Sequence, residues 1–229
     1  MGAPALSIVM PVLDEGERIA AAIDALAPLV ARGGELIVVD GGSHDGTADR
    51  ARAGGARVVC APRSRAAQMN AGATAAHGGS LLFLHADTRL PDGADDLIAQ
   101  ALRTRAWGRF DVQIEGRHPM LRVVAAMMNL RSRITGIATG DQAMFMSRAA
   151  FGQAGGFPAQ PLMEDIELSA RLRRIGRPAC LTACVVTSGR RWERDGTWRT
   201  ILLMWRLRFA YWRGAPPDDL HRRYYGPSR

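Results

Sequence analysis

Lysine is absent from this chain of 229 residues, so all 30 basic residues are arginines. A phosphate-binding loop of the form G-x-x-x-x-G-K-[ST] requires a lysine and therefore cannot be present. The glycine-rich turn G-x-G-x-x-G is also missing after the first expected strand, where the sequence reads Pro11-Val12-Leu13-Asp14-Glu15. These two absences argue against a P-loop ATPase and against a nicotinamide-dependent dehydrogenase.

Cysteines are few. The chain has 3 of them, Cys60, Cys180 and Cys184, and an odd number cannot pair completely. We therefore expect no disulfide framework and a reducing compartment. Cys180 and Cys184 flank an apolar run that carries no other metal-binding residue types, so both are expected to be small buried apolar side chains.

Long apolar runs are also missing. No stretch approaches the roughly 18 apolar residues that a membrane-spanning helix needs. The opening residues 1–6 carry no basic group ahead of the apolar run, which argues against a signal peptide. The prediction is a cytoplasmic protein, with attachment to the surface of the inner membrane left open.

The composition is ordinary for a folded domain, with 47% hydrophobic and 23% charged residues. The net charge of +8 is unevenly placed, because the chain from Arg190 onward holds ten arginines against four acids. A basic tail favours contact with nucleic acid or an anionic membrane. A plain solvated surface is the alternative.

The first ninety residues alternate between strand-like and helix-like segments. Strands are expected at 6–10, where Pro11 closes the run, and at 35–39, 57–60 and 80–84. Helices are expected at 15–31, 47–53 and 64–76. This alternation predicts an α/β fold with a mainly parallel sheet flanked by helices, whose strand ends gather at one edge.

The second half is less regular. Its periodicity indicates helices at 92–103, 120–134, 165–175 and 198–213, and strands at 108–114 and 142–146. We find no linker that would separate two independent domains.

Acidic residues follow three of the expected strands. Asp14-Glu15 follows the first, Asp40 ends the second and Asp87 follows the fourth. Any one of them alone is well explained as a helix cap or a surface acid. Three at converging strand ends favour a site for a cation, a ribose or a base. Asp87, with His85 nearby, is the best candidate to bind Mg²⁺ or Mn²⁺.

Several motifs together resemble a known family. Pro11–Glu15, Val39–Thr47, His85–Asp87 and Glu164-Asp165 resemble, in order and spacing, the signature of family 2 glycosyltransferases, which have the GT-A fold. The runs 65–73 and 188–192 resemble a narrower group, the small bacterial glycosyltransferases labelled as radical-SAM/selenodomain-associated. The resemblance covers nearly the whole chain. It implies a GT-A catalytic domain over 1–196 and a basic amphipathic helix and tail over 197–229.

The resemblance also implies roles for individual residues. The base and phosphates of a nucleotide-sugar donor would be bound by Pro11, Glu15, Asp40, Arg65, Ala86, Asp87 and Arg191. Mn²⁺ or Mg²⁺ would be held by Asp87, with His85 beside it. Asp165 would be the general base, with Glu164 as its neighbour. The acceptor side would include Gly140, Asp141, Gln142 and Trp192, the first three forming a tight turn if they have no such role.

Three positions depart from the family pattern. Leu13 and Asp14 stand where the family usually has a tyrosine and an asparagine, so stacking of the base at Leu13 is in doubt. Gly41 replaces the usual second acid, and His85 replaces the first aspartate of the metal motif. Metal binding therefore depends mainly on Asp87.

One base candidate stands out and no second carboxylate is placed as a nucleophile, so we expect direct displacement with inversion. The acceptor is unidentified, and a lipid-like molecule is one option. A nucleotidyltransferase that makes a nucleotide sugar is the alternative enzyme, although such enzymes usually carry a lysine-containing glycine-rich loop. A basic RNA-binding module is disfavoured because no RNA-binding signature is present.

The expected helix at 198–213 is amphipathic. Its apolar stripe consists of Trp198, Ile201, Leu202, Trp205, Phe209 and Trp212. Arg199, Arg206 and Arg213 follow a neighbouring line at intervals of seven residues. Such a helix can lie in the interface of an anionic membrane, or it can pack on the catalytic domain with its aromatic stripe inside.

Overall fold

The computed structural model describes residues 5–226, and residues 1–4 and 227–229 lie outside the described part. The expectation about a signal peptide concerns residues 1–6 and so lies mostly outside the described residues. Among the helices described, none is long and apolar enough to cross a membrane.

In the described part, eight strands form one mixed sheet with the order β3-β2-β1-β4-β7-β6-β8-β5. Neighbouring strands are parallel on the β3-β2-β1-β4 side and between β6 and β8, and β7 is antiparallel to both its neighbours. The strands are β1 (Leu6–Val12), β2 (Glu35–Asp40), β3 (Arg57–Cys60), β4 (Ser80–Phe83), β5 (Thr88–Arg89), β6 (Trp107–Glu115), β7 (Phe145–Ser147) and β8 (Ala179–Ser188).

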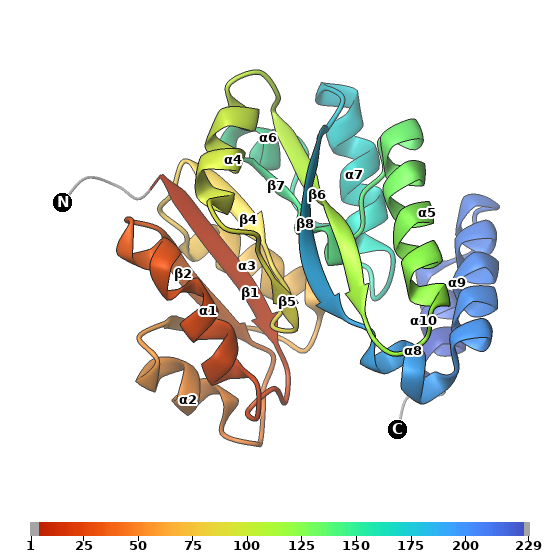
Figure 1. The fold of residues 1–229 in the computed structure, drawn as a ribbon, viewed down its shortest axis with the longest axis horizontal. Coiled ribbons are helices and arrows are strands. Elements are labelled where there is room, and N and C mark those ends of the chain that lie inside the picture. The colour runs from red at the N-terminus through yellow and green to blue at the C-terminus, as the bar shows by residue number, and fades with distance from the viewer. Residues whose placement is uncertain (1–4, 227–229) are drawn as a thin grey trace.

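Helices cover both faces of this sheet (Figure 1). They are α1 (Ile19–Ala31), α2 (Thr47–Ala53), α3 (Arg65–Ala75), α4 (Ala94–Leu102), α5 (Met120–Thr135), α6 (Arg148–Gln153), α7 (Glu164–Ile175), α8 (Arg190–Asp195), α9 (Thr197–Trp212) and α10 (Pro217–Tyr225), with a 3-10 turn, η1 (Gly140–Gln142), before β7. The predicted α/β fold with a mainly parallel sheet is confirmed.

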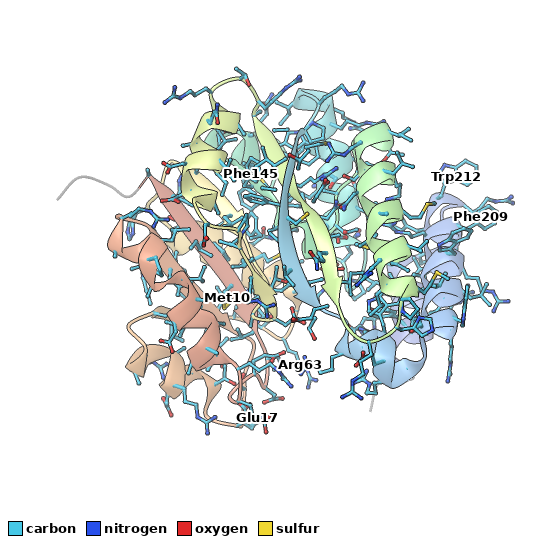
Figure 2. All side chains as sticks on the ribbon, viewed as in Figure 1. Met10, Glu17, Arg63, Phe145, Phe209 and Trp212 are labelled. Carbon is cyan, nitrogen blue, oxygen red and sulfur yellow. The ribbon has the colours of Figure 1, made fainter. Side chains whose placement is uncertain are left out.

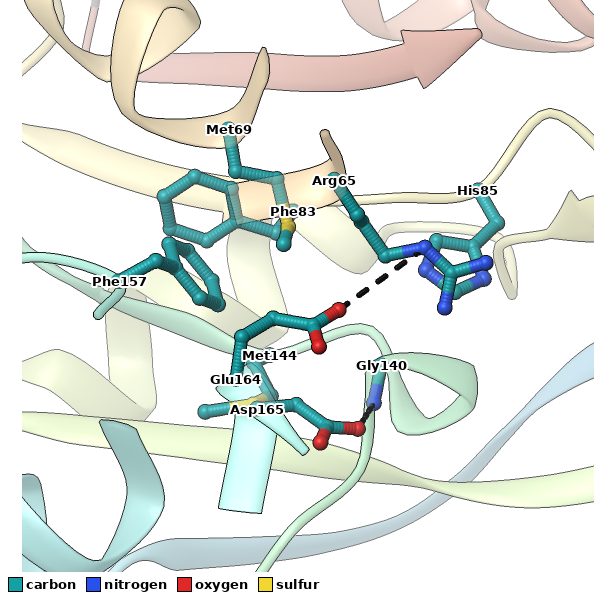
Figure 3. Close-up of a pocket in the computed structure, with 9 residues that line it drawn as sticks. All are labelled: Arg65, Met69, Phe83, His85, Gly140, Met144, Phe157, Glu164 and Asp165. Atoms are coloured by element: carbon teal, nitrogen blue, oxygen red, sulfur yellow. Dashed lines mark hydrogen bonds and ion pairs between the residues drawn. The ribbon is translucent and has the colours of Figure 1, made fainter. Parts of the chain in front are cut away.

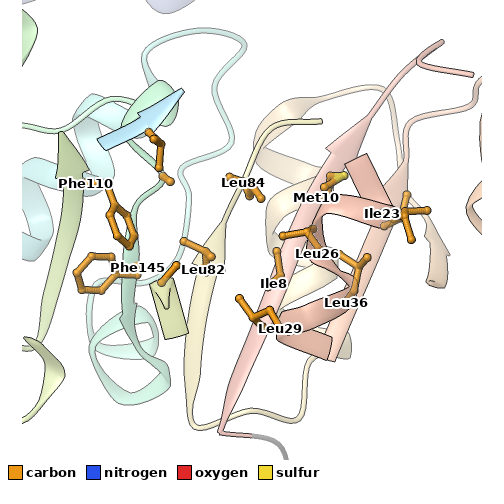
Figure 4. Close-up of a cluster of buried hydrophobic side chains, with 14 of the residues drawn as sticks. Ile8, Met10, Ile23, Leu26, Leu29, Leu36, Leu82, Leu84, Phe110 and Phe145 are labelled. Carbon is orange, nitrogen blue, oxygen red and sulfur yellow. The ribbon is translucent and has the colours of Figure 1, made fainter. Parts of the chain in front are cut away.

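The pleat of β1 builds a core on each face of the sheet. Ile8 and Met10 point to one face, where they pack with Ile23 and Leu26 of α1 (Figure 4). Val9 points to the other face, into a second cluster that includes residues of α3 and α7. Because β1 is buried on both faces, its sequence is continuously apolar rather than alternating.

The prediction that Pro11 closes the first strand is wrong. Pro11 pairs in register with Val39 of β2, and β1 continues to Val12. On its other side β1 pairs with β4 only as far as Val9. The carbonyl of Val9 accepts a hydrogen bond on the β4 side, so the missing N–H of Pro11, two residues on, would point past the end of β4. No ladder hydrogen bond is lost there.

Two further expectations need correction. The segment 142–146 is not a strand throughout, because Gln142 closes η1 and β7 begins at Phe145. Cys184 is exposed and Cys180 half-buried, so they are not the buried apolar side chains that the sequence predicted. All three cysteines are free thiols.

The C-terminal helices form a layer of their own at one side of the molecule. Leu207 of α9 and Leu220 of α10 pack with Met163, which directly precedes α7. The aromatic stripe of α9 faces away from this cluster: Trp205 is 66% exposed and Trp212 is 78% exposed. Of the two alternatives left open for this helix, burial of the aromatic stripe is therefore excluded.

Candidate active site

A pocket opens where the carboxyl end of β4 meets the beginnings of α3 and α7 (Figure 3). Its lining combines apolar and charged side chains, and consists of Arg65, Met69, Phe83, His85, Gly140, Met144, Phe157, Glu164 and Asp165. Four of the residues predicted from the sequence as catalytic, metal-binding or donor-binding thus meet in one pocket: Arg65, His85, Glu164 and Asp165. Gly140, predicted on the acceptor side, lines the same pocket.

Asp165 is held rigidly at the start of α7. One carboxylate oxygen accepts a hydrogen bond from the backbone N–H of Gly140 at 2.8 Å, and the other accepts one from the N–H of Ile166 at 2.7 Å. Burial raises the pKa of Asp165, although these two hydrogen bonds oppose the shift. The carboxyl group is therefore fixed in direction and more basic than an exposed aspartate.

Gly140 has no room for a side chain beside His85. A Cβ at this position would lie 2.9 Å from two atoms of the His85 imidazole ring. Any larger side chain would push the ring out of the pocket or move the N–H that orients Asp165.

Glu164 lies beside Asp165 and is almost fully buried. Its Oε1 is 4.0 Å from Nε of Arg65. Burial and, after it, the charge of Asp165 raise the pKa of Glu164 to about 7, against the opposing charge of Arg65. Arg65 lies near these acidic groups. Desolvation would lower the pKa of Arg65, but the charges of Glu164 and of the other acids raise it.

Glu164→Gln is expected to stabilise the fold at pH 8. The carboxyl has a pKa of about 7 when folded against a reference of 4.5, so its stabilising contribution is present below pH 4.5 and is lost as the pH rises through 7. The gain at pH 8 should be on the order of 1 to 3 kcal/mol, with no gain near pH 4. Urea unfolding at both pH values measures it. Glu167→Gln, on the partly exposed side of α7, is the control, and an equal effect there would contradict the assignment.

His85 lines the pocket, and Asp87 follows it two residues later in the chain. Burial, followed by the charge of Arg65, lowers the pKa of His85 to about 4, so its imidazole is neutral near pH 7. Its Nδ1 lies 3.7 Å from Oδ1 of Asp141. Asp87 is half-buried and close enough to act on the pKa of His85. Within residues 5–226, no cluster of three or more His, Cys, Asp or Glu side chains is placed to hold a metal by itself.

Asp40 organises the loop after β2. Its carboxylate accepts hydrogen bonds from the N–H of Gly42 at 3.2 Å and of Ser43 at 3.1 Å, and from the Ser43 hydroxyl. The Ser43 Oγ in turn accepts a hydrogen bond from the N–H of Asp14 at 2.9 Å. The loops after β1 and β2 are therefore tied together at the sheet edge.

The motif at 188–192 is distant in sequence from these loops but lies close to the loop after β1. Nη2 of Arg190 lies 4.0 Å from Oε1 of Glu15. The guanidinium of Arg191 stacks over the Tyr224 ring at 3.8 Å. Trp192 is half-buried against the main core, and so is Ala86. Arg190 thus stands near the predicted donor loop and Arg191 against α10, while Trp192 has a packing role that the sequence did not indicate.

Gln142 does not belong on the acceptor side, where the sequence placed it. Its side chain is fully buried. Its amide group donates to Oδ1 of Asn129 at 3.3 Å and to Oγ of Ser132 at 3.4 Å, which fastens η1 to α5. A side chain with these contacts holds the turn and cannot reach an acceptor.

Strained backbone surrounds the site. In the described part the non-glycine residues with positive φ are Asp14 at 52°, Ala143 at 46° and Met163 at 66°. They lie in the loop after β1, directly after η1 and directly before α7. Left-handed conformations in non-glycine residues cost free energy and concentrate at functional sites. Three of the segments that carry predicted site residues, or adjoin them, share this feature.

Two residues of this region were not predicted from the sequence. Gln68 on α3 donates through Nε2 to the carbonyls of Val12 and Val39, both at 2.8 Å, and so joins the ends of β1 and β2. Arg131 on α5 has Nε and Nη2 buried without a hydrogen-bond partner. Burial lowers the pKa of Arg131, and Asp165 is the first of the acids that counter this effect. Nothing in the helical pattern of 120–135 distinguishes Arg131 from its neighbours.

Two carboxylates at the start of α7, one arginine and a neutral histidine meet in a pocket beside the carboxyl end of β4, an arrangement that fits a glycosyltransferase of the GT-A class. A family model described as Glycosyl transferase family 2 matches residues 7–150. The chain belongs to this family and is a glycosyltransferase.

Its relatives agree with this assignment. A segment of 55 residues is 53% identical to glucosyl-3-phosphoglycerate synthase of Mycolicibacterium paratuberculosis. The matched segment makes up 24% of this chain and 17% of that relative. Glucosyl-3-phosphoglycerate synthase of Mycobacterium tuberculosis, solved with Mg²⁺ and uridine diphosphate, superposes with a TM-score of 0.58 at 23% identity, over 80% of this chain and 70% of that one. A mannosyltransferase of Pyrobaculum calidifontis, solved with GDP-Man and Mn²⁺, gives 0.59 at 21% identity, over 81% and 57%. At these identities the structures establish the shared fold.

Proposed function

We propose that this protein transfers a sugar from a nucleotide-diphosphate donor to an acceptor hydroxyl, with inversion at the sugar carbon. The observation that carries the proposal is the position of Asp165. It is a half-buried, oriented carboxylate of raised basicity in a pocket whose opposite side holds Arg65 and His85. A base is thus placed across a pocket from groups that suit a phosphorylated donor.

The donor would occupy the edge formed by the loops after β1, β2 and β4. The residues that we assign to it are Pro11, Glu15, Asp40, Arg65, Ala86, Asp87 and Arg191. The carboxylate of Asp40 already accepts three hydrogen bonds from its own loop, so its contribution to base recognition includes holding that loop in shape. Related structures solved with uridine diphosphate and with GDP-Man support a nucleotide-diphosphate donor.

The residues present fit a divalent cation that is shared with the donor. Asp87 offers a carboxylate and His85 offers a neutral imidazole nitrogen. Two protein ligands are too few for a closed protein site, but Mg²⁺ and Mn²⁺ at phosphate sites commonly take only one or two protein ligands, with phosphate oxygens completing the set. When bound, such a cation neutralises charge on the leaving diphosphate. Arg65 and Arg191 add positive charge on the same side.

The chain's own groups define the stereochemistry. Asp165 takes the proton of the acceptor hydroxyl as the oxygen attacks the sugar carbon and the bond to the diphosphate breaks. Glu164 is directed toward Arg65 and has a pKa of about 7, so it serves better to tune Asp165 and hold Arg65 than as a nucleophile. Because the acceptor oxygen displaces the diphosphate in one step, the configuration at the sugar carbon is inverted.

Three finer assignments are part of the proposal. Gly140 and Asp141 face the acceptor side of the pocket mouth. From the runs 65–73 and 188–192 we also propose that the chain belongs near the small bacterial radical-SAM/selenodomain-associated glycosyltransferases. The exposed stripe of α9 supports attachment to the cytoplasmic face of an anionic membrane, and with it a lipid-like acceptor. We do not propose the acceptor of glucosyl-3-phosphoglycerate synthase for this protein, because the matched segment is only 17% of that enzyme.

A thermal-shift screen of nucleotide sugars with and without Mn²⁺ tests the proposal. A ligand that binds only the native state raises its melting temperature, so we expect stabilisation by one donor class that requires the cation. Product analysis with the stabilising donor then separates the two candidate enzymes. Release of a nucleoside diphosphate supports transfer, whereas release of pyrophosphate from a nucleoside triphosphate and a sugar phosphate would instead establish a nucleotidyltransferase.

A further inference from the structure

Two helices that contact each other at one end of the protein each expose an apolar stripe. Each stripe repeats at intervals of three or four residues, and every member is between 51% and 78% exposed. The stripe of α5 was not evident from the sequence. We call the two stripes together the α5–α9 face; its members are Val123, Met127, Leu130 and Ile134 on α5 and Trp198, Leu202, Trp205, Phe209 and Trp212 on α9.

The α5–α9 face is left uncovered by the rest of the chain. The helices α5 and α9 contact each other and stand side by side at one end of the molecule (Figure 1). Phe209 and Trp212 project away from the domain (Figure 2), whereas Leu207 on the opposite side of α9 is buried against α10 and the start of α7. Contiguous exposed apolar side chains of this size mark an interaction site.

The charges beside this face select its partner. Trp198, Trp205 and Trp212 are each followed by an exposed arginine, Arg199, Arg206 and Arg213. Neither α5 nor α9 contains an aspartate or a glutamate. Tryptophan prefers the headgroup region of a bilayer, and arginine beside it is attracted to anionic lipid. A second copy that used the same face by two-fold symmetry would bring arginines against arginines, which is unfavourable.

We propose that the α5–α9 face docks on an anionic lipid membrane, with both helices lying in the interface. This orientation has a consequence for the acceptor, a step that rests on the proposed function. The chain leaves α5 at Thr135 and reaches η1 within a few residues, where Gly140 contacts Asp165. The acceptor side of the pocket is thus one short loop from the docked face. The acceptor class that fits is an amphiphile held in the membrane, with its hydroxyl group at the surface.

Flotation of the full chain with vesicles tests the docking. The wild-type protein should float with vesicles of phosphatidylcholine and phosphatidylglycerol, float poorly with phosphatidylcholine alone, and lose binding as salt is raised. Replacing Trp198, Trp205 and Trp212 together by serine should reduce vesicle binding by about tenfold or more, and so should Val123→Ser with Met127→Ser and Leu130→Ser. Val30→Ser, at an exposed apolar position on α1, is the matched control and should float as the wild type does.

The outcomes separate the alternatives. Wild-type flotation by the α5 triple variant would refute a role for α5. A wild-type protein that ignores vesicles and is a dimer, dissociated by either triple variant, would show that a second copy covers the face and would overturn the proposal. Failure of the docking proposal and failure of the proposed function are told apart by the nucleotide-dependent thermal shifts of the same proteins. Loss of docking leaves these shifts unchanged. Flotation without any nucleotide shift would sink the proposed function and leave the docking intact.

Discussion

Asp165→Asn is expected to lower the turnover of sugar transfer by about a thousandfold, with donor affinity nearly unchanged. The amide keeps the size of the carboxylate and can still accept a hydrogen bond from the N–H of Gly140, which now lies 2.8 Å from Oδ2. It cannot take the proton of an acceptor hydroxyl. Turnover is measured by release of nucleoside diphosphate at saturating donor, and donor affinity by thermal shift.

The control for this prediction lies on the same helix. Glu167 pairs with Arg171 at 3.0 Å on the partly exposed side of α7, so Glu167→Gln changes one charge without touching the pocket. It should keep nearly full turnover. If Asp165→Asn instead abolished the nucleotide-dependent shift and left turnover per bound donor intact, Asp165 would belong to the donor site and another base would have to be found.

The sheet was predictable from the sequence to the extent that its elements are locally determined. Residues 47–53 and 57–60 were predicted with the bounds that α2 and β3 have, because glycines end the one and apolar β-branched residues fill the other. The antiparallel insertion of β7 between β4 and β6 was not predictable. That pairing depends on contacts between residues such as Leu82 and Phe145, far apart in the chain, and no local pattern encodes it.

Some residues of the site were predictable from the sequence and others were not. Residues in short motifs at strand ends, such as Asp40 and Asp87, are visible because motif spacing places them. Residues that act through burial are not visible: Gln142 looked like part of a polar turn, yet its amide is fully buried against Asn129. Arg131 looked like one arginine among many, and only the fold shows that its unpaired Nε is buried on the side of Asp165. Sequence patterns report which groups are present, whereas desolvation depends on what the rest of the chain puts around them.

The exposed stripe on α9 illustrates a further limit. An apolar stripe at helical spacing predicts that something covers it, but not whether the cover is the chain itself or a partner. The sequence therefore left two alternatives, and the 66% exposure of Trp205 shows that the chain itself does not cover the stripe. The exposed fractions also reveal the stripe of α5, which contains no tryptophan and was not predicted from the sequence.

Asp87→Ala is expected to remove most of the stabilisation that a nucleotide diphosphate gives in the presence of Mn²⁺. Stabilisation by a ligand at about a hundred times its Kd is about 2.7 kcal/mol, which corresponds to a melting shift of roughly 5 to 10 °C for a chain of this size. Without the Asp87 carboxylate, His85 is the one remaining assigned ligand, and the cation and the diphosphate should no longer bind together. Transfer activity should fall in parallel.

The structure indicates that this variant will fold, which makes a negative result informative. The one side-chain hydrogen bond to Asp87 in the described part comes from the Thr88 hydroxyl at 3.5 Å, at the limit of such a contact. Asp49→Ala removes an acid that is 87% exposed on α2 and serves as the control, with an unchanged Mn²⁺-dependent shift. If Asp87→Ala kept the full shift while Asp165→Asn or His85→Ala lost it, the cation would be held deeper in the pocket. Asp87 would then have no part in binding the donor, and the carboxylates that line the pocket would have to supply both the metal ligand and the base.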